Sequence, residues 1–141
     1  MSRVYWDTML FVYWIESNPQ YAQRVQKINR RMEQRSDKLC TSIFAVGELL
    51  VGPRKTKDTE MERAICKYFQ TSAIEVLPFD AETAELYAQI RAEHNVSPAD
   101  AIHLATAAQA RVDLFLTNDR RLCRLNIPGI HFIAGLDTNL L

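Results

Sequence analysis

Short apolar runs alternate with longer stretches of mixed polarity along this chain. The short runs cover residues 4–6, 39–41, 74–77, 114–116 and 130–132, and have the length of buried strands. The longer stretches repeat apolar residues at the period of a helix. Strands separated by helices pair in parallel through right-handed crossovers. The pattern therefore predicts an α/β fold with a central, mostly parallel five-stranded sheet flanked by helices.

Capping and breaking residues mark the ends of the predicted helices. These helices cover residues 8–17, about 20–36, 43–51, 58–70, 81–93 and 98–110. Ser42 and Asp80 suit N-cap positions, and Pro98 suits the first turn of a helix. Asn18-Pro19 and Gly52-Pro53 are expected to end the first and the third helix. Without a repeat or a flexible linker, residues 1–141 are interpreted as a single domain.

Composition narrows the classes of protein that fit. The chain is 48% hydrophobic and 24% charged with zero formal net charge, so attraction to a nucleic acid would need local basic patches. Three cysteines without a CxxC pair argue against a zinc cluster or a disulfide framework and favour a reduced, cytoplasmic protein. The apolar start is bracketed by Asp7 and Glu16. That run is too short to span a membrane.

Three aspartates are predicted to meet at one edge of the sheet. Asp7 and Asp119 each follow a predicted strand, and Asp100 lies in the first turn of a helix. Ligands of such folds bind beyond the carboxyl ends of the strands, where these positions converge. A capping role alone would also explain each aspartate.

Glu48 is harder to explain by local structure. It lies in a helix that is apolar on nearly every side, and no lysine or arginine is within one turn. A buried carboxylate needs a positive or hydrogen-bonding partner, so the partner must be distant in sequence or be a metal. The neighbouring Gly47, costly in a helix, suggests that another group approaches closely.

Four carboxylates at one sheet edge would repel each other unless a cation lay among them. Oxygen ligands without histidine or cysteine spacing favour Mg²⁺, with Mn²⁺ as the alternative, over zinc. A metal in such a site activates water and neutralises a phosphate, which is the chemistry of phosphodiester hydrolysis.

Four segments of the chain resemble, in order, the four motifs of the PIN-domain family. They read VYWDT at residues 4–8, TSIFAVGELLVG at 41–52, SPADAIHLATA at 97–107 and FLTNDR at 115–120. Together they span nearly the whole chain, and the last two are the most specific. A chain of this length resembles the VapC-type ribonuclease toxins of prokaryotes, which a small antitoxin inhibits.

The resemblance implies a role for each acid. The four catalytic acids of the family fall on Asp7, Glu48, Asp100 and Asp119. The first and third of these are the usual Mg²⁺ ligands, and the other two complete the pocket. Thr117 and Asn118 match the polar residues before the fourth acid, where Thr117 is expected to give hydrogen-bonding support.

The implied reaction is in-line attack of a metal-activated water on RNA, leaving a 5′-phosphate and a 3′-hydroxyl. Arg120 and Arg121 directly follow the fourth acid and are candidate contacts for RNA phosphates. An antitoxin and a second copy of the chain are the expected protein partners. His103 lies on the same helix face as Asp100 and is interpreted as packed or hydrogen-bonded rather than as a ligand.

Two other classes of α/β protein with acidic sites do not fit this pattern. A response-regulator receiver needs adjacent acids after the first strand and a lysine after the last, whereas this chain has no lysine beyond Lys67. A haloacid-dehalogenase phosphatase needs a D-x-D motif after the first strand. In this chain Asp7 is followed by Thr8-Met9, so the second aspartate of that motif is missing. The alternative left open is a PIN-like domain that binds RNA or protein without cutting it. The presence of all four acids argues against this alternative.

Overall fold

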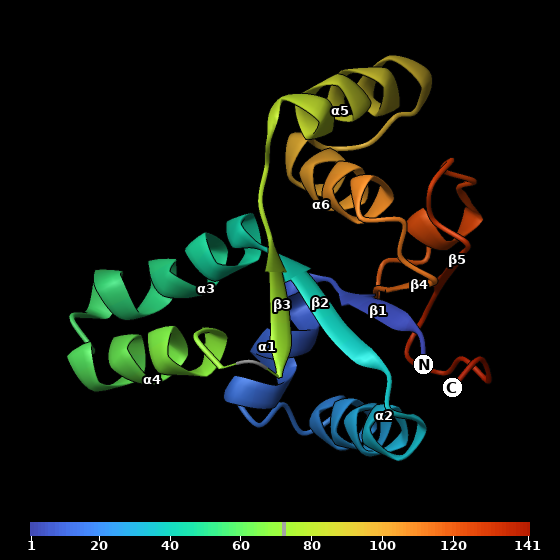
Figure 1. Ribbon diagram of the computed structural model, residues 1–141. Coiled ribbons are helices and arrows are strands. Elements are labelled where there is room, and N and C mark those ends of the chain that lie inside the picture. The colour runs from blue at the N-terminus through green and yellow to red at the C-terminus, as the bar shows by residue number, and fades with distance from the viewer. Residues whose placement is uncertain (72) are drawn as a thin grey trace.

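One five-stranded sheet forms the centre of the computed structural model, which describes residues 1–71 and 73–141 (Figure 1). The strands lie in the order β3-β2-β1-β4-β5, and all neighbouring strands are parallel. Their bounds are β1 Arg3–Trp6, β2 Lys38–Ser42, β3 Ile74–Leu77, β4 Leu114–Leu116 and β5 Phe132–Ala134. The predicted α/β class and five-stranded parallel sheet are confirmed.

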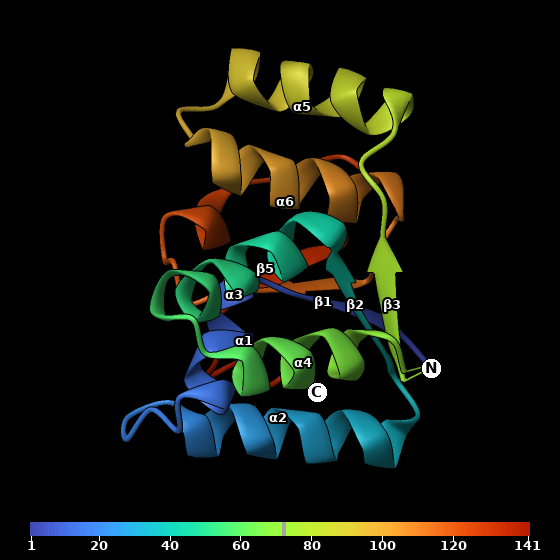
Figure 2. The same cartoon turned by 90° about the vertical axis from the view of Figure 1, so that its left-hand side faces the viewer.

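Helices cover both faces of this sheet (Figure 2). Their bounds are α1 Thr8–Ile15, α2 Ala22–Arg35, α3 Ile43–Thr56, α4 Thr59–Phe69, α5 Ala81–Glu93 and α6 Pro98–Gln109, with a short 3₁₀ helix, η1, at Leu122–Arg124. In Figure 2, α5 and α6 lie above the sheet and α1, α2 and α4 lie below it. Helices α3 and α4 form a pair that projects beyond the sheet (Figure 1).

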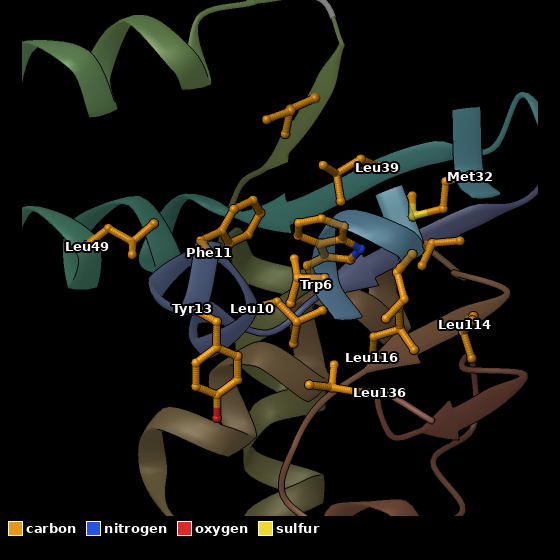
Figure 3. Packing of buried hydrophobic residues seen from close by; sticks show 14 of the residues in the cluster. Trp6, Leu10, Phe11, Tyr13, Met32, Leu39, Leu49, Leu114, Leu116 and Leu136 are labelled. Carbon is orange, nitrogen blue, oxygen red and sulfur yellow. The ribbon is translucent and has the colours of Figure 1, made fainter. Parts of the chain in front are cut away.

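The central strand β1 contributes side chains to two separate hydrophobic cores, because its side chains alternate between the faces of the sheet. Val4 and Trp6 pack into the core between the sheet and α1, α2 and α4. Tyr5 packs into the core between the sheet and α5 and α6. All three are fully buried. Figure 3 shows Trp6 among Leu10 and Phe11, whose ring centroid lies 5.2 Å from that of Trp6. This alternation aims Tyr5 at α6.

The prediction that Gly52-Pro53 ends the third helix is wrong. Helix α3 continues to Thr56 and stops at Lys57, which adopts a left-handed conformation with φ of 57°. The carbonyls of Pro53 and Arg54 accept hydrogen bonds from the N–H groups of Asp58 and Lys57, at 2.9 and 3.4 Å. These two bonds form a Schellman motif, so the helix end is set by this closure rather than by the proline.

The last strand begins two residues later than predicted. Ile130 is buried, but it belongs to a turn in which its N–H donates to the carbonyl of Ile127 at 3.0 Å. Gly129 precedes it with φ of +100°, and a Cβ there would lie 2.6 Å from the carbonyl oxygen of Ala108. A buried residue in a tight turn has the same apolar signature as a strand residue, which explains the error.

No helix within residues 1–71 and 73–141 has the length and apolar character needed to cross a lipid bilayer. Cys40, Cys66 and Cys123 are all free thiols.

Candidate functional site

A pocket of about 480 Å³ lies at the carboxyl ends of β1 and β4. Its wall is formed by the start of α1, one face of α3, the first turns of α6 and the loop after β4. All four predicted acids line it: Asp7, Glu48, Asp100 and Asp119. The parallel topology therefore brings together four carboxylates from four separate segments of the chain.

Asp7 is the most deeply placed of the four acids. Its side chain is 14% exposed. One oxygen accepts a hydrogen bond from the hydroxyl of Thr117 at 2.9 Å, and the other accepts one from the N–H of Thr8 at 2.7 Å. The predicted capping role is thus present, but the carboxylate also faces the pocket. Burial raises the pKa of Asp7 above its usual value, and the negative charge of Asp100 adds to the increase.

Glu48 has hydrogen-bonding partners that are distant in sequence. Its Oε1 accepts a hydrogen bond from the hydroxyl of Thr8 at 2.6 Å and lies 2.8 Å from Nε2 of His103. Burial opposes ionisation, but these two contacts outweigh it and hold the pKa of Glu48 below its usual value. The side chain is 33% exposed, so the carboxylate that was expected to be buried is only partly buried.

The interpretation of Gly47 is also wrong. A Cβ built on this residue would have no heavy atom within 4 Å, so its glycine is not needed for the close approach of another group. Gly47 lies on the exposed face of α3, away from the contacts that hold Glu48. The structure gives no physical reason for a glycine at this position.

Asp100 and Asp119 are held by contacts within their own segments of the chain. Asp100 is in the first turn of α6, where its N–H donates to the hydroxyl of Ser97 at 3.1 Å. Both carboxylate oxygens of Asp119 accept hydrogen bonds from the guanidinium of Arg121, at 2.9 and 3.2 Å. That contact holds the pKa of Asp119 below its usual value.

Thr117 joins two of the acids through one buried hydroxyl. It donates to Asp7 and accepts a hydrogen bond from the N–H of Asp119 at 3.1 Å. The side-chain amide of Asn118 donates to the hydroxyl of Tyr13 at 3.0 Å, at the wall of the pocket. Thr117 therefore fixes the position of Asp7 relative to the loop that carries Asp119.

Sequence reasoning missed three hydroxyl groups around the pocket, those of Tyr5, Thr8 and Tyr13. The sequence pattern indicates Thr8 only as the start of a predicted helix and Tyr5 only as part of a predicted strand, and it gives no role to the hydroxyl of Tyr13. The alternation of side chains along the strand would have placed Tyr5 beneath α6, where it meets His103. The interpretation of His103 as a packed, hydrogen-bonded histidine is confirmed by its three hydrogen-bonding contacts and its burial.

The two arginines after Asp119 line the same pocket. The Arg121 side chain is 85% exposed although its guanidinium is bound to Asp119. Arg120 is also exposed. Contact of either arginine with an RNA phosphate stays a prediction.

The chemistry of the pocket fits a hydrated Mg²⁺ better than a dehydrated cation. Within residues 1–71 and 73–141, no three acidic, histidine or cysteine side chains converge closely enough to enclose a metal. Mg²⁺ keeps several waters and is commonly held by only one or two carboxylates. A pocket of about 480 Å³ has room for such an ion with its waters, and a cation there would offset the cost of burial that raises the pKa of the Asp7 carboxylate.

Comparisons with known proteins agree with this architecture. The model of the PIN domain matches residues 4–128. The chain belongs to the PIN domain family. It is 30% identical over 120 residues to the tRNA(fMet)-specific endonuclease VapC of Shigella flexneri, covering 82% of this chain and 85% of that protein.

Two solved structures have a similar fold. The chain superposes on a structure of VapBC2 from Rickettsia felis bound to a promoter DNA fragment with a TM-score of 0.75 at 20% identity, covering 94% of this chain and 98% of that chain. A toxin–antitoxin complex from Klebsiella pneumoniae gives a TM-score of 0.67 at 20% identity, covering 90% of this chain and 94% of the other.

Proposed function

We propose that this PIN-domain protein is a Mg²⁺-dependent endoribonuclease and the toxin of a type II toxin–antitoxin pair. The observation that carries the proposal is the placement of Asp7, Glu48, Asp100 and Asp119 around one pocket. A structural role in capping would not require these four positions to face the same space. Similarity to a tRNA-cutting endonuclease along most of the chain supports the same conclusion.

Asp7 and Asp100 are the proposed ligands of the cation, and Glu48 and Asp119 complete the acidic pocket. When bound, Mg²⁺ supplies charge neutralisation for the scissile phosphate and lowers the pKa of a coordinated water. Mn²⁺ has the same preference for oxygen ligands and is the expected substitute. Thr117 keeps Asp7 in place through its 2.9 Å hydrogen bond, so this carboxylate needs little rearrangement to bind a cation.

RNA is the proposed substrate, with Arg120 and Arg121 as contacts for its phosphates. Because the net charge of the chain is zero, the positive groups at the pocket mouth must supply the local attraction. Asn118, held by Tyr13, forms part of the wall that a nucleotide would meet.

A small antitoxin is the proposed protein partner, since the similar structures include toxin–antitoxin complexes. A homodimer and a cytoplasmic location belong to the same proposal, and three free thiols are typical of a reducing compartment. Expression without the antitoxin is expected to arrest growth, and unimpaired growth would contradict the toxin role alone.

The test of ribonuclease activity is incubation of the purified protein with total RNA, with Mg²⁺ or with EDTA. We expect Mg²⁺-dependent cleavage that leaves a 5′-phosphate and a 3′-hydroxyl at the mapped ends. Cleavage that persists in EDTA would contradict metal dependence. If the protein retains RNA without cutting it in Mg²⁺ or Mn²⁺, the alternative of a binding domain without nuclease activity replaces this proposal.

A further inference from the structure

A chain of buried polar groups connects the sheet to Glu48. The hydroxyl of Tyr5 lies 2.6 Å from Nδ1 of His103, and Nε2 of the same ring lies 2.8 Å from Oε1 of Glu48. The hydroxyl of Thr8 completes the group, 3.0 Å from Nε2 of His103 and 2.6 Å from Oε1 of Glu48. These contacts join α6 to β1, α1 and α3.

The positions of the protons in this hydrogen-bonded group depend on which of its atoms can donate. Glu48 is ionised at neutral pH and can only accept, so Nε2 of His103 carries the proton that it shares between Glu48 and Thr8. Tyr5 is fully buried and burial raises its pKa, so it keeps its proton and donates to Nδ1. The ring is therefore held in one tautomer from both sides.

The same bonds fix the orientation of Glu48. Within the part of the chain that the structure describes, both hydrogen-bonding partners of this carboxylate meet Oε1. No hydrogen bond to the second oxygen, Oε2, is found there, and Glu48 lines the pocket. A glutamate on a helix has three rotatable side-chain torsions, so two contacts to one oxygen remove much of its freedom.

We propose that Tyr5 and His103 are positioning residues, which hold Oε1 of Glu48 through the Nε2–H tautomer of His103 and thereby present Oε2 to the pocket. This inference rests on the proposed ribonuclease function of that pocket. Tyr5 does not line the pocket, so it acts only through the ring of His103. A histidine present for packing alone would not need partners on three other elements.

The tautomer of His103 provides a test that needs neither metal nor RNA. The chain has three histidines, so ¹⁵N-histidine labelling gives few signals, and a His103→Gln variant identifies the one that matters. We expect long-range ¹H–¹⁵N spectra at neutral pH to show His103 with Nε2 protonated and Nδ1 free. Tyr5→Phe, which preserves the stacking on Phe115, should reduce the population of that tautomer. An Nδ1–H tautomer or a doubly protonated ring in the wild-type protein would overturn the assignment.

RNA cleavage then tests positioning with a matched pair of variants. Tyr5→Phe should lower kcat roughly tenfold with little change in KM, as is typical when a group that orients a functional side chain is lost. Tyr68→Phe makes the same change on α4, outside the pocket, and should cleave like the wild type. Equal activity of the Tyr5→Phe and Tyr68→Phe variants would overturn the inference.

Substitution of the ring itself gives a second comparison. Glutamine can offer an N–H to Glu48, whereas leucine cannot, so His103→Gln should retain more activity than His103→Leu. Equal loss in both folded variants would contradict the role of the Nε2 donor. If the leucine variant does not fold, the Tyr5→Phe comparison still decides the question. If the wild-type protein cuts no RNA, the proposed function fails, while the tautomer spectrum still supports or overturns the hydrogen-bonded chain.

Discussion

The four acids of the pocket form two pairs with different surroundings. The inner pair, Asp7 and Glu48, is held by hydroxyl, backbone and ring donors that come mostly from other elements of the fold. The outer pair, Asp100 and Asp119, has local surroundings: Asp119 is bound by an arginine two residues away, and Asp100 lies in the first turn of α6. The inner pair is thus fixed mainly by tertiary contacts, and the outer pair by contacts within its own segments of the chain.

This difference indicates how the site divides its tasks. Donors anchored in the core keep the inner carboxylates in place before any ligand arrives, which is the arrangement that favours electrostatic preorganisation. The contact between Arg121 and Asp119 is exposed, so it exchanges easily with water, a cation or a phosphate. We therefore expect changes around the inner pair to affect catalysis more than changes around the outer pair's arginine.

The largest effect is expected from removing one charge of each pair. Asp7→Asn and Asp100→Asn should each abolish Mg²⁺-dependent RNA cleavage, since both acids are proposed ligands of the cation, while circular dichroism remains that of the wild type. Gel assays on a defined RNA measure this directly. Full cleavage by either variant would remove that residue from the proposed ligand set.

The next effect concerns the hydroxyl that supports the inner pair. Thr117→Val keeps the shape of the buried side chain but removes the donor to Asp7, and should lower kcat by about 10- to 100-fold. Thr106→Val is the matched control, because among residues 1–71 and 73–141 that buried hydroxyl bonds only to the carbonyl of Ile102 in its own helix. Comparable losses of activity in the two variants would show that Thr117 acts through stability alone.

Removing the charge of Asp7 and removing the charge of Glu48 should change the free energy of unfolding in opposite directions. The pKa of Asp7 is raised by burial, so its ionised form destabilises the folded state at neutral pH. In EDTA at pH 7, Asp7→Asn should therefore raise the free energy of unfolding by about 1 kcal/mol. The gain should fade as the pH falls through the raised pKa towards the usual one, where the wild-type carboxyl is protonated in both states.

Glu48→Gln provides the opposite case. The pKa of Glu48 is lowered in the folded protein, so its charge stabilises the fold above the usual pKa, and this contribution is lost as the pH falls through the lowered value. The variant should be less stable than the wild type at neutral pH and should approach it in acid. Denaturant unfolding at several pH values measures both variants, and a shared sign would contradict the description of the inner pair.

The smallest effect is expected at the arginine of the outer pair. Arg121→Gln should leave the free energy of unfolding nearly unchanged, because the ion pair is exposed. It should increase the affinity for Mn²⁺ a little, since Asp119 loses its neutralising partner. Titration at low and high salt measures this, and a large fall in stability would show that the outer pair is as firmly fixed as the inner one.

The fold was largely predictable because its strands are short, apolar and separated by capped helices. The errors fall where local signals conflict with tertiary contacts. Pro53 sits in the last turn of α3 and does not stop it, and Ile130 is buried in a turn rather than in a strand. Neither can be decided from the pattern of apolar residues.

The acids of the site were predictable from their places after strands and in first turns, but their supports were not. Hydrogen bonds from Thr117 to Asp7, from Thr8 to Glu48 and between Tyr5 and His103 join residues at least 40 positions apart. Hydroxyl groups are common, and nothing local distinguishes one that supports a carboxylate from one that caps a helix. The hydrogen-bonding partners of the inner pair could therefore be identified only from the structure. Arg121, the partner of Asp119, is only two residues away in the sequence.

The central claim is that the four carboxylates form one site for a divalent cation. Calorimetric titration of the metal-free protein with Mn²⁺ or Mg²⁺ tests it most directly. The wild-type protein should bind the ion saturably, and Asp7→Asn and Asp100→Asn should abolish or strongly weaken binding while remaining folded. Absence of uptake by the wild type, or unchanged uptake by both variants, would contradict the account.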